Sequence, residues 1–172
     1  MAIITTAGHV DNALRFFNQS SNMWVGLGKS DSSWSNENVP DPEDTSTIKF
    51  TGLLGMRKAT DISLALKVPT GTTGSDIVTY GGETWQLVSS SDAQTKGANY
   101  VYVSTTIGKD ELTSGTYRQV GLFLNPTFKS GVTAVAVTGD NVVSQGTLEM
   151  YENRTPLNKT NADVIERFIL KF

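Results

Sequence analysis

The stretch that decides the fold class is Asp61-Ile62-Ser63-Leu64-Ala65-Leu66-Lys67-Val68. Its large apolar side chains occupy every second position, and the residues between them are small or charged. Successive side chains of a β-strand point to opposite faces of a sheet, so this period of two predicts a strand that is buried on one side. A sheet of such strands has to cover its apolar face with another layer.

The same alternation recurs on both sides of that stretch. Further strands are predicted at residues 23–28, 85–87, 100–103, 120–124, 132–137, 148–150 and 168–172. Turn-forming pairs such as Gly81-Gly82 and Asn125-Pro126 lie between them. Many short strands with regular turns, without the repeat that a propeller requires, predict a mainly β protein. We expect an antiparallel β-sandwich with residues 1–172 as a single domain.

One segment, over about residues 8–19, is predicted to be helical. Apolar side chains recur there with the spacing i, i+3, i+4 and i+7 that marks one helix face: Val10, Ala13, Leu14 and Phe17. Thr6 is the predicted N-cap. After the strand at 23–28, a polar loop that holds Pro40 and Pro42 is predicted over about residues 29–46. Connections are usually about 4–6 residues long, so a loop of roughly 18 residues indicates a binding role or local disorder.

Composition excludes several classes of protein. The chain has no cysteine, which rules out disulfides, thiolate zinc sites and cysteine nucleophiles. Its net charge is −3, and its 14 basic residues are scattered, so we expect no nucleic-acid partner. No run approaches the roughly 18 apolar residues of a membrane span. The segment Met1–Thr6 has no basic region before its apolar residues, so no classical signal peptide and no membrane partner are expected.

Motifs for chemistry are incomplete. Gly28-Lys29-Ser30 ends like a phosphate-binding loop, but Met23 stands where that motif needs its first glycine. His9 is the only histidine, and no Gly-x-Ser-x-Gly elbow accompanies it, so a solvent-facing helix residue is predicted. Asp41-Pro42-Glu43-Asp44, with Glu37 upstream, lacks the ligand pattern of a calcium loop and is interpreted as a solvated loop. We therefore expect no catalytic, metal or cofactor-binding residue, although an enzyme that uses these carboxylates remains an alternative.

The segment Tyr151-Glu152-Asn153-Arg154-Thr155-Pro156 is more informative. It combines an aromatic residue, an acid, an amide and a guanidinium before a turn that Pro156 is predicted to limit. A guanidinium can bind a carboxylate through two parallel hydrogen bonds. Arg154 is therefore either an internal strut to Glu37 or Glu152, or a contact with a neighbouring subunit, and both hypotheses stay open.

Three blocks of this chain resemble a known family. The stretch Lys29-Ser30-Asp31-Ser32-Ser33-Trp34-Ser35-Asn36-Glu37-Asn38 resembles an early segment of the baseplate wedge protein, gene product eight, of T-even contractile-tailed bacteriophages. Residues 116–120, which run on to Asn125-Pro126, are similar to a later strand of that family. Residues 150–156 and 169–172 resemble its C-terminal segments. The blocks keep their order, but the interval 50–114 is compact, which indicates a shortened form.

The resemblance implies a structural, non-enzymatic wedge subunit of a contractile tail baseplate. It implies assembly in the host cytoplasm, incorporation into the virion, contacts with other wedge proteins, and a homodimer or higher assembly. The residues predicted to form the protein interface are Trp34, Asn36, Glu37, Asn38, Arg118, Tyr151, Glu152, Asn153 and Arg154. The alternative is a carbohydrate- or receptor-binding β-sandwich module of a virion, in which Trp24, Trp34 or Trp85 stacks on a sugar ring.

Overall fold

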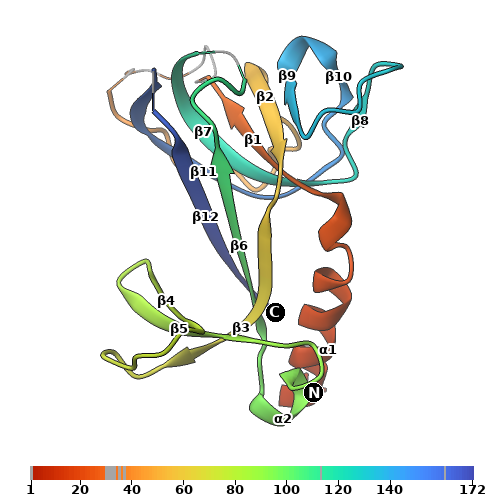
Figure 1. The fold of residues 1–172 in the computed structure, drawn as a ribbon, viewed down its shortest axis with the longest axis vertical. Coiled ribbons are helices and arrows are strands. Elements are labelled where there is room, and N and C mark those ends of the chain that lie inside the picture. Colours follow the sequence, from red (N-terminus) through yellow and green to blue (C-terminus); the bar gives the residue numbers. More distant parts are fainter. Residues whose placement is uncertain (1, 30–33, 35, 37, 113, 161) are drawn as a thin grey trace. The chain divides into compact units, whose positions relative to one another are not determined.

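A computed structural model describes residues 2–29, 34, 36, 38–112, 114–160 and 162–172 (Figure 1). The fold is mainly β, its sheets are antiparallel, and one helix of three turns lies near the N-terminus. The predicted fold class is therefore confirmed. None of the helices among the described residues is long and apolar enough to cross a membrane.

The chain divides into two compact units, each built from separated segments. Unit 1 comprises Met1–Ser21, Thr60–Ser104 and Arg167–Phe172. Unit 2 comprises Asn22–Ala59 and Thr105–Glu166. The chain thus passes from one unit to the other at four points along the sequence.

Unit 1 consists of two helices and the strands of a five-stranded sheet. Its elements are α1 (Thr6–Phe17), β3 (Asp61–Val68), β4 (Ile77–Tyr80), β5 (Glu83–Val88), α2 (Ala93–Lys96) and the parts that fall in this unit of β6 (Tyr100–Ile107) and β12 (Val164–Lys171). The strand order is β12-β6-β3-β5-β4, so β3 is central. Leu64 and Ala65 point to opposite faces of β3, and both are fully buried. The prediction that β3 buries one side only is wrong at its centre, because both faces are covered there.

Helix α1 begins at Thr6, the residue that was predicted as its N-cap. The N-cap is Thr5, whose side-chain oxygen accepts a hydrogen bond of 3.1 Å from the backbone N–H of Gly8, so the prediction of Thr6 is wrong. The helix ends at Phe17, and it is the side chain of Phe16, not that of Phe17, that is buried. Phe16 packs against Phe172 with 5.0 Å between ring centroids, and the helix also packs on β3 and α2.

The β4–β5 hairpin turns through two glycines, as the sequence indicated. Gly81 and Gly82 have φ angles of 62° and 76°, which the favoured two-residue hairpin turn requires and side chains disfavour. Trp85 follows on β5, where its indole N–H donates to the Tyr80 carbonyl over 3.1 Å. This indole is buried and packs edge-on against Tyr100.

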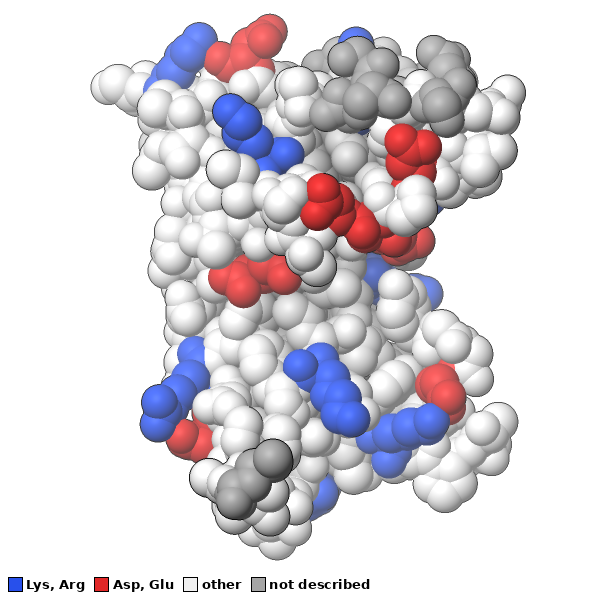
Figure 2. Space-filling model, turned by 180° about the vertical axis from the view of Figure 1, so that it is seen from behind, with Lys and Arg blue, Asp and Glu red and all other residues white. Residues whose placement is uncertain are grey.

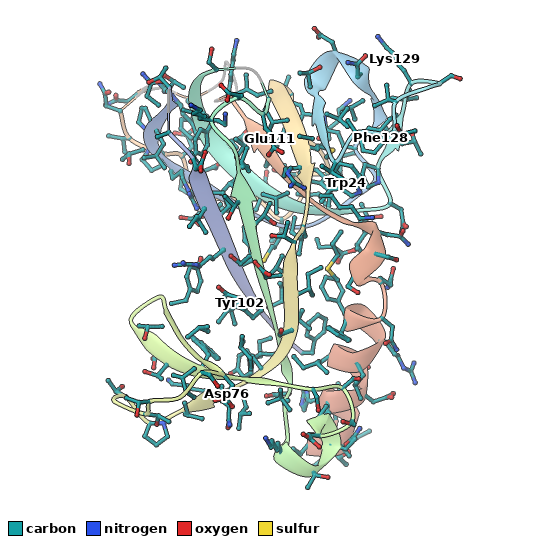
Figure 3. All side chains as sticks on the ribbon, in the orientation of Figure 1. Trp24, Asp76, Tyr102, Glu111, Phe128 and Lys129 are labelled. Atoms are coloured by element: carbon teal, nitrogen blue, oxygen red, sulfur yellow. The ribbon has the colours of Figure 1, made fainter. Side chains whose placement is uncertain are left out.

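Unit 2 is organised around a five-stranded sheet. Its strands, in the order β11-β7-β1-β2-β9, are β1 (Met23–Gly28), β2 (Leu53–Lys58), β7 (Gly115–Leu124), β9 (Ala136–Thr138) and β11 (Thr147–Lys159). A two-stranded sheet of β8 (Thr127–Phe128) and β10 (Val142–Ser144) accompanies it, with short 3-10 turns at Ser20–Asn22 and Gly139–Asn141. Every residue of the central strand β1 is buried. Its Trp24 ring lies 4.6 Å from that of Phe128, and both are labelled in Figure 3.

Some predicted boundaries are wrong. The strand predicted at 132–137 is reduced to β9, and the one at 148–150 extends from Thr147 to Lys159 as β11. The turn predicted at Tyr151–Pro156 is therefore strand. Four strands were not predicted: β2, β4, β8 and β10. In the described residues, no helix or strand occurs between β1 and β2, so the polar loop continues past residue 46 to residue 52.

Candidate protein interface

The loop between β1 and β2 is fastened to β11 through Tyr151. The phenol oxygen of Tyr151 accepts a hydrogen bond from the backbone N–H of Asp44 and donates one of 3.1 Å to the Asp44 carbonyl. The side chain of Thr47 lies 3.1 Å from the same oxygen. The Tyr151 ring also packs edge-on against Phe50, which belongs to the core of unit 2. One side chain thus ties the loop both to the strand and to the core.

Asn153 fastens the same loop two residues further along β11. Its backbone N–H donates to Oε1 of Glu43 over 2.9 Å, and its side-chain amide donates to the Asp41 carbonyl over 3.0 Å. Its Oδ1 accepts from the amide of Gln119 on the adjacent strand β7, also over 2.9 Å. Because alternate residues of a strand share a face, Tyr151 and Asn153 act on the same side of the sheet.

Glu152 and Arg154 point to the opposite side of β11. One guanidinium nitrogen of Arg154 lies 2.8 Å from Glu152, and the other lies 2.8 Å from Oε2 of Glu166. The second oxygen of Glu166 accepts a hydrogen bond of 2.7 Å from the hydroxyl of Tyr117. Tyr117 and Glu166 are almost fully buried, so both oxygens of an internal carboxylate have partners.

The electrostatics of this network favour the ionised pair. Burial lowers the pKa of Arg154, but the charges of Glu166 and Glu152 and their hydrogen bonds outweigh it, so the pKa is raised overall. Burial and then the hydrogen bond to Glu166 raise the pKa of Tyr117 well above its ordinary value. Arg154 is thus a strut to Glu152, as one of the two hypotheses had it. Glu37, the other proposed partner, lies outside the described residues.

The backbone of β11 is not regularly paired with β7 at Arg154. The pairing of β11 with β7 shifts register between Asn153 and Leu157, so the residues between them form a bulge. Proline has no N–H to give to a ladder and is found in sheets at edges and bulges. Pro156 therefore ends the regular pairing locally without ending the strand, which is why the predicted turn is absent.

Trp34 lines the same pocket as Tyr151 and Asn153, which share one face of β11. Its half-buried side chain lines a pocket of about 360 Å³ in unit 2. We call this the Trp34 pocket. Its lining residues are Trp34, Asp41, Pro42, Asp44, Thr47, Lys49, Thr51, Gln119, Tyr151 and Asn153. Two regions predicted separately from the sequence, the tryptophan loop and the Tyr151 segment, thus meet at one place.

The other predicted residues that the structure describes are not among those that line the pocket. Asn36 and Asn38 are exposed, and Oδ1 of Asn36 accepts from the backbone N–H of Asn38 over 2.9 Å. Val39, which follows, is 56% exposed. Arg118 is half-buried and lines a different depression with Lys29 and residues 114–116. The structure therefore brings together three of the nine predicted residues: Trp34, Tyr151 and Asn153.

Several residues that shape this surface were not predicted. Gln119, Asp41 and Thr47 all contribute to the pocket. The hydrogen bonds from Tyr151 join residues more than 100 positions apart, so only the topology brings them together. One pattern in the sequence could have separated the two groups. Tyr151 and Asn153 alternate with Glu152 and Arg154, and a strand places alternate residues on opposite faces.

Four of the residues that the sequence offered as candidates for catalysis, metal binding or sugar binding are Asp44, His9, Trp24 and Trp85, and the structure describes their surroundings. Hydrogen bonds from Ser46 hold the pKa of Asp44 below its usual value. His9 is half-buried and its Nδ1 is buried without a hydrogen-bond partner, so the prediction of a solvent-facing side chain is wrong. Among described residues, no group of three or more His, Asp or Glu could hold a metal ion. Trp24 and Trp85 are buried, so the prediction that they might stack on a sugar is wrong as well.

Most of the face shown in Figure 2 is covered by uncharged side chains, with acidic and basic residues scattered over it. The sequence predicts the same distribution, because its 17 acidic and 14 basic residues are interspersed. A protein that contacts others through such a surface relies on local features, such as an anchored loop with a half-buried tryptophan. It relies less on a large surface area of positive or of negative charge.

Comparison with known proteins identifies the class. The family model of the baseplate wedge 3 tail fiber network component matches residues 1–172, and the chain belongs to that family. It is also 33% identical over 173 residues to Virion protein 3 of Enterococcus phage phiEF24C, an alignment that covers 99% of this chain and 94% of the relative. The protein is thus a structural component of a phage baseplate and part of the virion. The resemblance to phage baseplate wedge proteins is confirmed.

Proposed function

We propose that this chain works by protein–protein assembly, as a wedge subunit of a contractile tail, and performs no catalysis. The observation that carries the proposal is the anchoring of an otherwise irregular loop by Tyr151 and Asn153. A loop that is held before binding loses little conformational entropy when a partner contacts it.

The proposed contact surface is the loop around Trp34, Asn36, Asn38 and Val39, for which neighbouring baseplate proteins are the proposed partners. Val39 adds an exposed apolar side chain to the loop that carries Trp34, and tryptophan is among the residue types most enriched where interfaces concentrate their binding energy. Glu152 and Arg154 are used within the chain, and we assign them a supporting role. Arg118 is retained as a candidate contact on a second site.

The test is incorporation of variants into wedge complexes assembled from the phage's own baseplate proteins. Trp34→Ala is expected to leave the isolated fold intact and to weaken assembly by about 1–2 kcal/mol, as truncation at interface centres does. Val39→Asp is expected to weaken assembly too, because it places a charge in the contact. Sedimentation of the complexes reports the amount incorporated.

The matched control is Val143→Asp, which changes another exposed valine of unit 2. It is expected to assemble normally. Equal incorporation of all three variants and the unmodified chain would show that the loop makes no contact. Self-association into a homodimer or larger assembly, which we also propose, is measured on the isolated chain by analytical ultracentrifugation.

A further inference from the structure

We propose that the Trp34 pocket binds an uncharged sugar ring, so that this baseplate protein carries a carbohydrate site that shares Trp34 with its proposed assembly surface. The proposal goes beyond the structural role. It rests on one pocket within unit 2, where an aromatic side chain, charged groups of both signs and fixed amides line the same space.

The size of the pocket suits a small ligand. Its volume of about 360 Å³ lies at the lower end of the range of roughly 300–1,000 Å³ for ligand sites. Such sites pair an apolar or aromatic wall with a few placed polar groups that fix orientation. A pyranose ring has a matching construction, with an apolar face of C–H bonds and a rim of hydroxyls.

Trp34 supplies the aromatic wall. The side chain is half-buried, so part of the indole is supported by the protein while part remains accessible at the pocket. Covering an accessible indole face with the C–H face of a sugar removes apolar area from water, and this favours binding. The other two tryptophans are buried among their own neighbours, which leaves Trp34 to form such a platform.

The charged residues favour an uncharged ligand. Asp41 and Lys49 both line the pocket, and neither side-chain charge makes a hydrogen bond or ion pair with another described residue. A carboxylate accepts hydrogen bonds and an ammonium only donates them. Sugar hydroxyls can satisfy both groups, whereas an anion would be repelled by Asp41 and Asp44, and a cation by Lys49.

The polar wall is held in place before any ligand arrives. Asn153 is bonded to Gln119 and to the Asp41 carbonyl, and Tyr151 is bonded to Asp44. These contacts fix the backbone that carries Asp41 relative to β7 and β11. Prearranged polar groups raise affinity because little ordering is left for the binding step.

The experiment is a titration of the full chain with methyl glucoside, methyl galactoside, methyl mannoside and N-acetylglucosamine, followed by NMR. At least one of them is expected to bind with a dissociation constant on the order of 1 mM, typical of a single small contact. Trp34→Ala is expected to weaken binding at least about tenfold. Trp34→Phe, which keeps a smaller ring, is expected to weaken it less.

Controls separate this site from the assembly surface. Val39→Asp is expected to bind sugar normally while assembling poorly. Asp41→Ala and Lys49→Ala are expected to weaken sugar binding. These two variants test the site if Trp34→Ala proves unfolded. Absence of binding for every sugar up to about 10 mM, or unchanged binding in Trp34→Ala and Asp41→Ala, overturns the proposal. Loss of assembly in Trp34→Ala without sugar binding also overturns it, and assigns the pocket to a protein contact.

Discussion

At the scale of single residues, the internal carboxylate Glu166 of unit 2 depends on its hydrogen-bond and ion-pair partners. Its side chain is 3% exposed, and its oxygens are shared between Arg154 and Tyr117. A buried charge without its partners is strongly destabilising, whereas a satisfied one contributes little net stability. Glu166 and Arg154 therefore specify how β11 and β12 fit locally.

Replacing Glu166 by Gln tests this argument. The substitution keeps the shape, leaves the guanidinium of Arg154 with one carboxylate, and is expected to lower the free energy of unfolding by about 2–3 kcal/mol. Urea unfolding measures the change. The comparison is Arg15→Ala, which breaks an exposed i,i+4 pair with Asp11 and should change stability by less than about 0.5 kcal/mol. Equal effects of the two substitutions would refute the argument.

Asp76 gives a pH dependence at the same scale. Its carboxylate accepts a hydrogen bond of 2.7 Å from Gln86, and this bond is the main reason why its pKa lies below the ordinary value of 3.8. A lowered pKa in the folded state contributes stability above pH 3.8, and that contribution is lost as pH falls through the folded-state pKa. Asp76→Asn is therefore expected to flatten the loss of stability in acid. An unchanged slope below about pH 4 in urea titrations would contradict this assignment.

At the scale of elements, glycines with positive φ are not equivalent. Gly146, just before β11, has φ +76°, and a Cβ there would lie 2.0 Å from the Leu124 carbonyl oxygen. Gly81 in the β4–β5 turn has φ +62°, but a Cβ there meets nothing within 4 Å. Backbone conformation restricts both positions, and neighbouring atoms restrict only Gly146.

Alanine at the two positions should therefore differ in effect. Gly81→Ala is expected to cost about 1 kcal/mol, the penalty for a side chain in the left-handed region. Gly146→Ala adds a clash with backbone that cannot move aside, and is expected to cost at least about 3 kcal/mol or to prevent soluble expression. Thermal unfolding of both variants measures the difference, and similar melting temperatures would be evidence against it.

The strands that the sequence predicted are those with a clear period or an uninterrupted apolar run. β3 alternates, and β1 is a short apolar run ended by glycine. β2 was missed because Leu54, Gly55 and Met56 are all buried, so no alternation marks it. β8 and β10 hold two and three residues, too few to show any period. Pro156 indicated a turn, but a bulge in a strand accommodates a proline as readily as a turn does.

At the scale of the whole molecule, the match to the family model extends over residues 1–172 and shows which family the chain belongs to. That match does not show which surface binds partners. Three blocks of residues were enough to indicate a baseplate wedge protein. The meeting of Trp34 with Tyr151 could not be predicted, because it depends on a loop that folds back across β11. Arg154, predicted from the same block as Tyr151, lies on the other face of that strand because successive side chains of a strand alternate between its faces.

The division of the chain into two interleaved units also bears on the order of events during synthesis on the ribosome. Unit 2 ends at Glu166, whereas unit 1 combines the first 21 residues with Arg167–Phe172. Domains generally fold as units while the chain is made. Unit 1 contains segments made before unit 2 and segments made after it, and its sheet cannot be completed until the edge strand β12 has been made. Until then the Phe16 ring of helix α1 lacks its contact with Phe172, although β3 and α2 are already available to cover other parts of the helix.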